Sequence, residues 1–207
     1  MGALGGGSAI DSELQSLEML RYDDRTEAIN KLTPEHKREL IARVKRMHIP
    51  DYQASHYTDL LLHFGDDKTI QKQADLMIHK DDLGAYYSLR TCRDPQVIAA
   101  MCPAFFMDES KSNLPYVVSS EMLFMIPKTP GFNPEVYQWA AELRAEMSPQ
   151  TSRIFREWWK ANENAFKKKN YKAVKPGGLS ITDPVDSYKP NAEARQSTPL
   201  EEPKNGK

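Results

Sequence analysis

Several features that define common protein classes are missing from this 207-residue sequence. It contains no run of 18 or more apolar residues, so it predicts no transmembrane helix. Residues 1–9 lack the positive start and the long apolar segment of a secretory signal peptide. The formal net charge of −1 excludes a globally basic nucleic-acid binder and a globally acidic chain. Any electrostatic function must therefore depend on a local patch.

Cysteine is also scarce. Cys92 and Cys102 are too few for a small domain built on disulfides. We expect them to be small buried apolar side chains, as free cysteines commonly are. A Cys92–Cys102 disulfide, which needs an oxidising compartment, and a catalytic thiol remain the alternatives. No histidine stands in an obvious relation to either cysteine.

Motifs that carry chemistry are absent as well. The five histidines form no H-E-x-x-H, and the sequence has no C-x-x-C or EF-hand spacing. It has no P-loop, no G-x-S-x-G and no dinucleotide-binding glycine pattern. The acidic pairs Asp66-Asp67 and Asp81-Asp82 stand at expected helix boundaries, where capping explains them. We therefore predict no catalytic residue, no metal ligand and no cofactor.

What the sequence does contain is a repeated helix start. A side chain that can cap a helix is followed by proline at Thr33-Pro34, Asp94-Pro95, Asn133-Pro134 and Ser148-Pro149. The cap oxygen accepts a hydrogen bond from an otherwise unpaired N–H, and proline has no N–H to leave unpaired. Four such starts in one chain indicate a multi-helix domain.

Apolar residues between these starts recur with a period close to 3.6, as in amphipathic helices. Gly65 is expected to end one helix, and Pro103 to kink or shorten another. The segment "LPYVV" at 114–118 is the only strand candidate, with the next helix expected over 119–126. The prediction is an all-α domain at 11–176 of seven to nine short antiparallel helices. A flexible Gly-rich leader at 1–10 precedes it, and a Pro-rich, charged tail at 177–207 follows.

The order of these segments resembles that of HEAT-repeat-like (armadillo-type) helical proteins from bacteria. The resemblance covers approximately residues 24–176 and is carried by "LLLHFGDDKTIQKQADLM", "LRTCRDPQVIAAMCPAFF" and the closing "GFNPEVYQWAAEL" and "FREWWKANENAFKKKNYKAVKPG". It implies stacked antiparallel helix pairs in an α–α superhelix. The repeats are degenerate, because the pairs at 51–79 and 83–107 align poorly. The resemblance transfers no catalytic residue, although some HEAT-like proteins are DNA glycosylases.

The last helical stretch combines aromatic and basic residues. Between Arg153 and Lys175 stand eight lysines and arginines against two acids. Such a stretch can hold phosphates and stack on bases, or lie on an anionic membrane surface. However, Phe155, Trp158, Trp159, Asn162 and Phe166 form one helical stripe, with Lys160, Glu163 and Lys167 opposite. We therefore expect the aromatic side chains to pack in the core and the lysines to face water.

The function favoured by these patterns is a non-catalytic protein-binding or scaffold module that presents a helical surface to another protein or peptide. Nucleic-acid binding, or a HEAT-like DNA glycosylase, is the alternative. The predicted binding residues mix aromatic and polar character, as binding surfaces often do, and are His56, Tyr57, His63, Tyr86, Tyr87 and Arg90. The expected location is cytoplasmic, or extracytoplasmic if the Gly-rich start replaces a native signal peptide. The partner and the oligomeric state are left open.

Overall fold

A computed structural model describes residues 9–50, 53–145 and 150–179. Within these ranges the chain forms ten α-helices and three 3-10 helices, without a strand. The α-helices are α1 (Ala9–Met19), α2 (Tyr22–Asn30), α3 (Pro34–Arg46), α4 (Ala54–His63), α5 (Asp67–Lys80), α6 (Leu83–Thr91), α7 (Pro95–Met101), α8 (Leu114–Met125), α9 (Pro134–Ala145) and α10 (Thr151–Lys167). The 3-10 helices are η2 (Cys102–Phe106), η3 (Ile126–Lys128) and η4 (Tyr171–Ala173). The prediction of an all-α fold is confirmed.

Three of the four predicted helix starts are formed as expected. The Thr33 hydroxyl accepts a hydrogen bond from the His36 N–H, and Asp94 accepts one from the Gln96 N–H at 2.8 Å. The Asn133 side chain accepts from the Glu135 N–H at 2.7 Å. Each satisfies a backbone donor that the first turn of a helix leaves unpaired. The fourth start, Ser148-Pro149, lies outside the described residues.

Helix ends also follow the sequence. Gly65 has φ +77° just after α4, a left-handed conformation that glycine adopts without strain. Pro103 ends the regular helix: α7 stops at Met101 and the chain continues as the 3-10 helix η2.

The only strand candidate, "LPYVV" at 114–118, is helical and forms the first turns of α8. Pro115 is tolerated there since its ring occupies the first turn of the helix, where an N–H has no intrahelical partner. Leu114, Val118 and Met122 follow a helical period and are buried. The helix therefore begins five residues before the expected Ser119.

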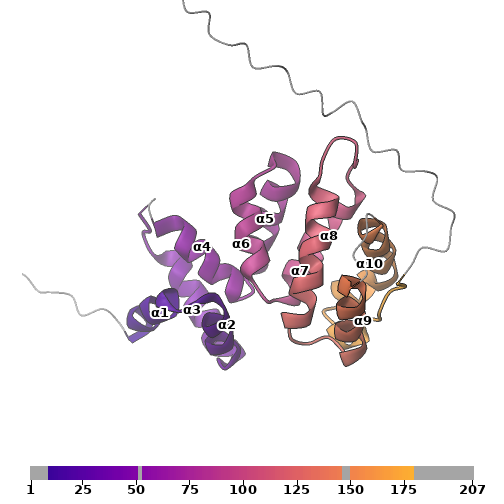
Figure 1. The fold of residues 1–207 in the computed structure, drawn as a ribbon. Coiled ribbons are helices and arrows are strands. Elements are labelled where there is room, and N and C mark those ends of the chain that lie inside the picture. Colours follow the sequence, from indigo (N-terminus) through magenta and orange to yellow (C-terminus); the bar gives the residue numbers. More distant parts are fainter. Residues whose placement is uncertain (1–8, 51–52, 146–149, 180–207) are drawn as a thin grey trace, which may run out of the picture.

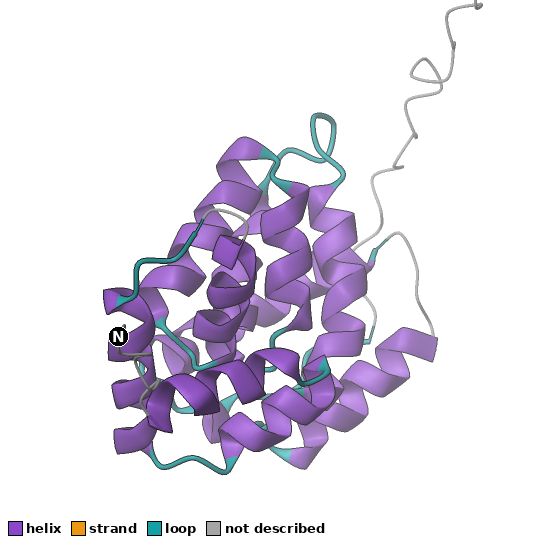
Figure 2. Ribbon diagram, turned by 90° about the vertical axis from the view of Figure 1, so that its left-hand side faces the viewer, coloured by secondary structure: helices purple, strands orange, loops and turns teal. Residues whose placement is uncertain are grey.

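Neighbouring helices along the chain also lie side by side in space, from α1–α4 at one end to α9 and α10 at the other (Figure 1). Helix α4 contacts both α5 and α6, α5 contacts α7, and α8 contacts α9 and α10. The view turned by 90° shows helices throughout, joined by short loops (Figure 2). Their buried side chains form a smaller cluster in the α1–α4 region and a larger one extending over α4–α10.

Helix α10 closes the larger cluster through its aromatic stripe. Trp158 is 1% exposed and stacks on Trp139, with 5.4 Å between ring centroids. Phe155, Asn162 and Phe166 of the same stripe are buried, and Trp159 is partly buried. This confirms that the stripe packs in the core.

The segment after α10 continues this packing. The indole N–H of Trp158 donates to the Lys175 carbonyl at 2.8 Å, and that of Trp139 donates to the Gly178 carbonyl at 3.1 Å. A Cβ atom on Gly177 would lie 2.8 Å from the Trp139 ring, so only glycine fits there without a shift. The chain is therefore packed against the helices as far as Gly178.

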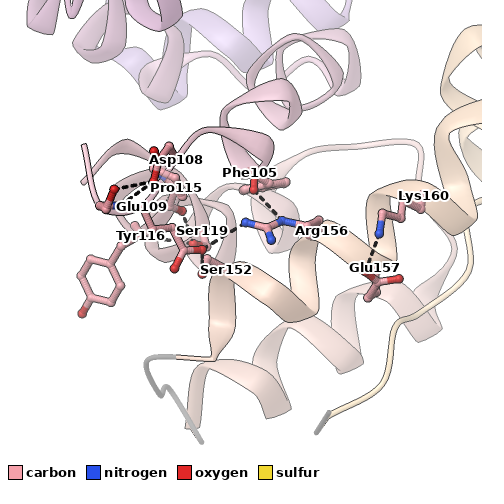
Figure 3. A network of polar contacts seen from close by, with 11 residues as sticks. Phe105, Asp108, Glu109, Pro115, Tyr116, Ser119, Ser152, Arg156, Glu157 and Lys160 are labelled. Atoms are coloured by element: carbon pink, nitrogen blue, oxygen red, sulfur yellow. Dashed lines mark hydrogen bonds and ion pairs between the residues drawn. The ribbon is translucent and has the colours of Figure 1, made fainter. Parts of the chain in front are cut away.

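A polar network connects α10 with η2 and with the loop before α8 (Figure 3). The Arg156 guanidinium donates to the Phe105 carbonyl at 2.7 Å and to Glu109 at 3.1 Å. Ser152 donates to the same carboxylate at 3.2 Å. Arg156 thus has a structural role, and Tyr116 points away from this network into solvent (Figure 3).

Candidate functional site

Three of the predicted binding residues lie together on α6. The Arg90 guanidinium lies 5.4 Å from the ring centroid of Tyr87 and 5.8 Å from that of Tyr86. Tyr86 itself is buried, whereas Tyr87 is 55% exposed. Arginine over an aromatic face is an attractive cation–π arrangement. The structure therefore places the exposed Tyr87 ring and the Arg90 guanidinium next to each other on the surface of α6.

The other three predicted residues are elsewhere. His56 is exposed on α4, where its Nδ1 lies 2.7 Å from a carboxylate oxygen of Glu18. Tyr57 is 6% exposed and belongs to the core of the first four helices. His63 is 7% exposed and contacts the Thr26 hydroxyl of α2 at 3.2 Å. All three lie on α4, where His56 contacts α1 through Glu18 and His63 contacts α2 through Thr26.

Burial controls the protonation of His63 and Tyr86. Burial, and then the charges of Arg25 and Arg93, lowers the pKa of His63 to about 4. Burial, and then the Glu121 carboxylate, raises the pKa of Tyr86 to about 12. The Tyr86 hydroxyl donates to Glu121 at 3.0 Å, which joins α6 to α8.

Sequence reasoning missed two residues beside Tyr87 and Arg90, which are Glu121 and Asp59, and a cation–π pair formed by Phe124 and Arg144. Glu121 of α8 lies 3.6 Å from the Arg90 Nε, and Phe124 follows it one turn later, 41% exposed. Arg144 of α9 covers the Phe124 ring at 4.2 Å. Asp59 of α4 lines a hollow together with Tyr87 and Arg90 of α6. No sequence signal places α8 or α9 beside α6. Of the missed residues, Asp59 is the one that the sequence could have indicated, because it stands at i+3 on the side of α4 that carries His56 (i) and His63 (i+7).

We call the surface that these contacts define the α4–α6–α8 face; it comprises Asp59, Leu83, Tyr87, Arg90 and Glu121. Leu83 and Tyr87 stand one turn apart on α6, and both are more than half exposed. Exposed leucine and aromatic side chains gathered on one surface are typical of interaction sites.

A hollow of about 250 Å³ opens in this face between α4 and α6. Asp59, Tyr87, Ser88, Arg90 and Thr91 line it. The Oδ1 atom of Asp59 is buried and accepts no hydrogen bond from the described residues. Burial raises the pKa of this carboxyl, against the opposing effects of the Ser88 hydroxyl and the charges of Arg25 and His56.

Two further hollows differ in character. One of about 660 Å³ is lined, among the described residues, by side chains of α5, including Lys68, Lys72 and Lys80. The other, of about 330 Å³, lies between α5, α7 and the end of α10. Its rim carries an ion pair of 3.0 Å between Lys169 and Asp67, so these charges are already paired within the chain.

The described residues were also compared with the patterns of metal sites, reactive thiols and membrane spans. Among the residues that the structure describes, no three His, Cys, Asp or Glu side chains are grouped so as to hold a metal ion. Cys92 and Cys102 are both buried as free thiols, and burial raises the pKa of each. None of the described helices is both long and apolar enough to span a membrane.

Comparisons of the chain with protein-family models, with curated proteins and with solved structures give no match.

Proposed function

We propose that the protein is a non-catalytic protein-binding module and that the α4–α6–α8 face is its binding surface. The observation that carries the proposal is the exposed Tyr87 ring with the Arg90 guanidinium 5.4 Å from its centroid, beside a hollow of about 250 Å³. Aromatic and arginine side chains supply much of the binding energy at protein interfaces, above all where they border a pocket.

The arrangement of the helices supports this reading. Helices α4, α6 and α8 supply the residues of one face, while α5, α7 and α10 contact one another. Such alternation is expected of stacked antiparallel helix pairs, the HEAT-like arrangement that the sequence resembles. In that arrangement consecutive pairs offer a continuous surface to an extended partner.

Features of the basic C-terminal helix favour a protein over a nucleic acid as the partner. Trp139 and Trp158 are buried, so their rings are not accessible for stacking on bases. Lys160 pairs with Glu157, Lys167 with Glu163 and Lys169 with Asp67. These pairs engage three of the eight basic side chains of this stretch and so reduce the positive charge available to phosphates.

The proposal is tested with a phage-displayed library of random peptides selected on the immobilised full chain. Enriched peptides are synthesised, and their affinities are measured by fluorescence anisotropy. Tyr87→Ala and Arg90→Ala are each expected to weaken binding by about tenfold or more, the effect of removing an interface residue worth about 1.4 kcal/mol.

Tyr116→Ala is the matched control. Tyr116 is 52% exposed, close to the 55% of Tyr87, but it lies in the first turn of α8, before Glu121, the α8 residue that contacts α6. It should leave affinity unchanged. Equal losses from Tyr116→Ala and Tyr87→Ala, or enriched peptides indifferent to both α6 changes, would contradict the proposal.

A further inference from the structure

The segment that follows α10 is bound to the helices in the way that a protein binds a peptide ligand. Residues 174–178, which we call the C-terminal strap, form no regular secondary structure and run beside α9 and α10 (Figure 1). We propose that α9 and α10 carry a second binding surface, which holds an extended peptide of a partner protein by its main chain. The strap occupies this surface as an internal competitor. The surface shares no residue with the α4–α6–α8 face, so the inference goes beyond the proposed function.

One asparagine of α10 pairs with both main-chain groups of Lys175. The Oδ1 atom of Asn162 accepts from the Lys175 N–H at 2.8 Å, and its Nδ2 donates to the Lys175 carbonyl at 3.1 Å. Asn162 is buried, and its Nδ2 also donates to the Trp158 carbonyl at 2.9 Å, which fixes the orientation of the amide. The Trp158 indole N–H donates to the Lys175 carbonyl at 2.8 Å. Lys175 is therefore bound through its backbone, while its side chain is exposed.

Two further carbonyls of the strap are bound by Asn133, just before α9, and by Trp139 within α9. The Asn133 amide donates to the Val174 carbonyl and the Trp139 indole N–H donates to the Gly178 carbonyl, each at 3.1 Å. All of these hydrogen bonds use main-chain atoms of the strap, and every peptide has such atoms. An extended peptide of another protein can therefore form the same set of bonds.

Two positions of the strap select the sequence that fits. Val174 is fully buried and packs in the larger cluster of buried side chains. A Cβ atom on Gly177 would lie 2.8 Å from the Trp139 ring, so this position has no room for a side chain. Lys175 and Pro176, which stand between them, are exposed. The partner is therefore expected to present an extended Val-x-x-Gly segment, in which the two middle residues are free to vary.

The bonds of the strap can be exchanged for those of a partner. Val174 is extended, with φ −64° and ψ 129°, and Pro176 favours an extended conformation at the residue before it. A partner peptide of the same shape supplies the same carbonyls, so its entry leaves no donor of the surface unpaired. The strap, however, is tethered close to the surface and acts there at an effective concentration of about a millimolar. The original chain is therefore expected to bind free peptides only weakly.

The test uses a fluorescein-labelled peptide of residues 171–179, and its binding to the full chain is measured by fluorescence anisotropy. Gly177→Ala in the full chain places a methyl group against the Trp139 ring and weakens the strap without changing α9 or α10. This variant is expected to bind the peptide about tenfold or more tightly than the original chain does, because the internal competitor is weakened. Val174→Ala, a second change confined to the strap, should act in the same direction.

Altered peptides test what the surface recognises. A peptide with the Gly177→Ala change meets the Trp139 ring, and a peptide N-methylated at Lys175 lacks the N–H that Asn162 accepts. Each is expected to bind the Gly177→Ala chain about tenfold or more weakly than the unaltered peptide does. A peptide with the Lys175→Ala change is the matched control and should bind unchanged.

Equal affinities of the original and variant chains for the peptide would overturn the proposal. Equal binding of the unaltered, N-methylated and Gly177→Ala peptides would overturn it as well. Circular dichroism shows whether each chain variant is folded, and a single folded variant is enough to decide. If neither Gly177→Ala nor Val174→Ala folds, the strap is an inseparable part of the core and not a displaceable ligand.

Discussion

At the residue scale, His63 shows how burial sets a chemical property. It lies at the end of α4, 7% exposed, beside Thr26 and near the cations Arg25 and Arg93. Protonation adds a buried positive charge close to two others, so the neutral imidazole is favoured in the folded chain. This histidine joins α4 to α2 and was predicted, from its place in the sequence, to be a binding residue.

The stability of the fold should therefore depend on the protonation of His63. Its pKa falls from an ordinary 6.5 to about 4 on folding, so the unfolded chain binds the proton more tightly. The stabilisation is complete above pH 6.5 and is lost as the pH falls from 6.5 to about 4, by about 3 kcal/mol. Denaturant unfolding measured across this range checks the sign and the size.

The carboxylates of the chain also titrate in acid, so variants isolate the contribution of His63. His63→Gln keeps a polar side chain but does not titrate, and its unfolding free energy should fall less between pH 6.5 and 4. His79→Gln, on the exposed side of α5, should behave as the original chain does. Identical pH profiles for all three proteins would refute the effect of burial.

At the scale of elements, helix α10 divides into a packed and a solvated side. Trp158→Ala removes a ring that is 1% exposed and stacked on Trp139, and should lower the free energy of unfolding by about 3–5 kcal/mol. Lys160→Ala removes only an exposed pair with Glu157 and should cost less than about 0.5 kcal/mol. Urea unfolding monitored by circular dichroism compares the two variants. If both lower the free energy of unfolding by a similar small amount, the Trp158 side of α10 does not pack in the core.

Local signals explain which elements could be predicted. The helix starts at Thr33, Asp94 and Asn133 could be predicted because capping depends on neighbours in sequence. The aromatic stripe of α10 could be predicted because its residues recur with a helical period. The segment at 114–118 was a strand candidate because Val117 and Val118 are β-branched residues, which favour strands when tertiary packing is ignored. Contacts of Leu114 and Val118 with the core override that preference.

The candidate site could be predicted only in part for the same reason. Tyr86, Tyr87 and Arg90 stand within one helix turn or two, so their proximity is a local property. Glu121 joins them across 35 positions of sequence from Tyr86, and Asp59 joins them from another helix. Such contacts depend on the order in which helices pack, which periodicity alone does not specify.

At the scale of the whole molecule, α4 connects the two clusters of buried side chains. Leu60 packs in the cluster of the first four helices, whereas Leu62 packs in the larger cluster of the later helices. Both leucines are fully buried. A helix shared in this way couples the two halves, because neither cluster can lose its contacts with α4 without exposing apolar surface.

We therefore expect the chain to unfold in one cooperative step. The fluorescence of the three tryptophans measures unfolding at the C-terminal helices. All three lie on α9 and α10, remote in sequence from Leu60. Leu60→Ala should cost about 2–5 kcal/mol and shift the tryptophan fluorescence and the circular dichroism midpoints together. Leu83→Ala, at a side chain 63% exposed, should shift neither midpoint. If Leu60→Ala moves the dichroism midpoint but not the fluorescence midpoint, the first helices unfold separately, and α4 does not couple the two clusters.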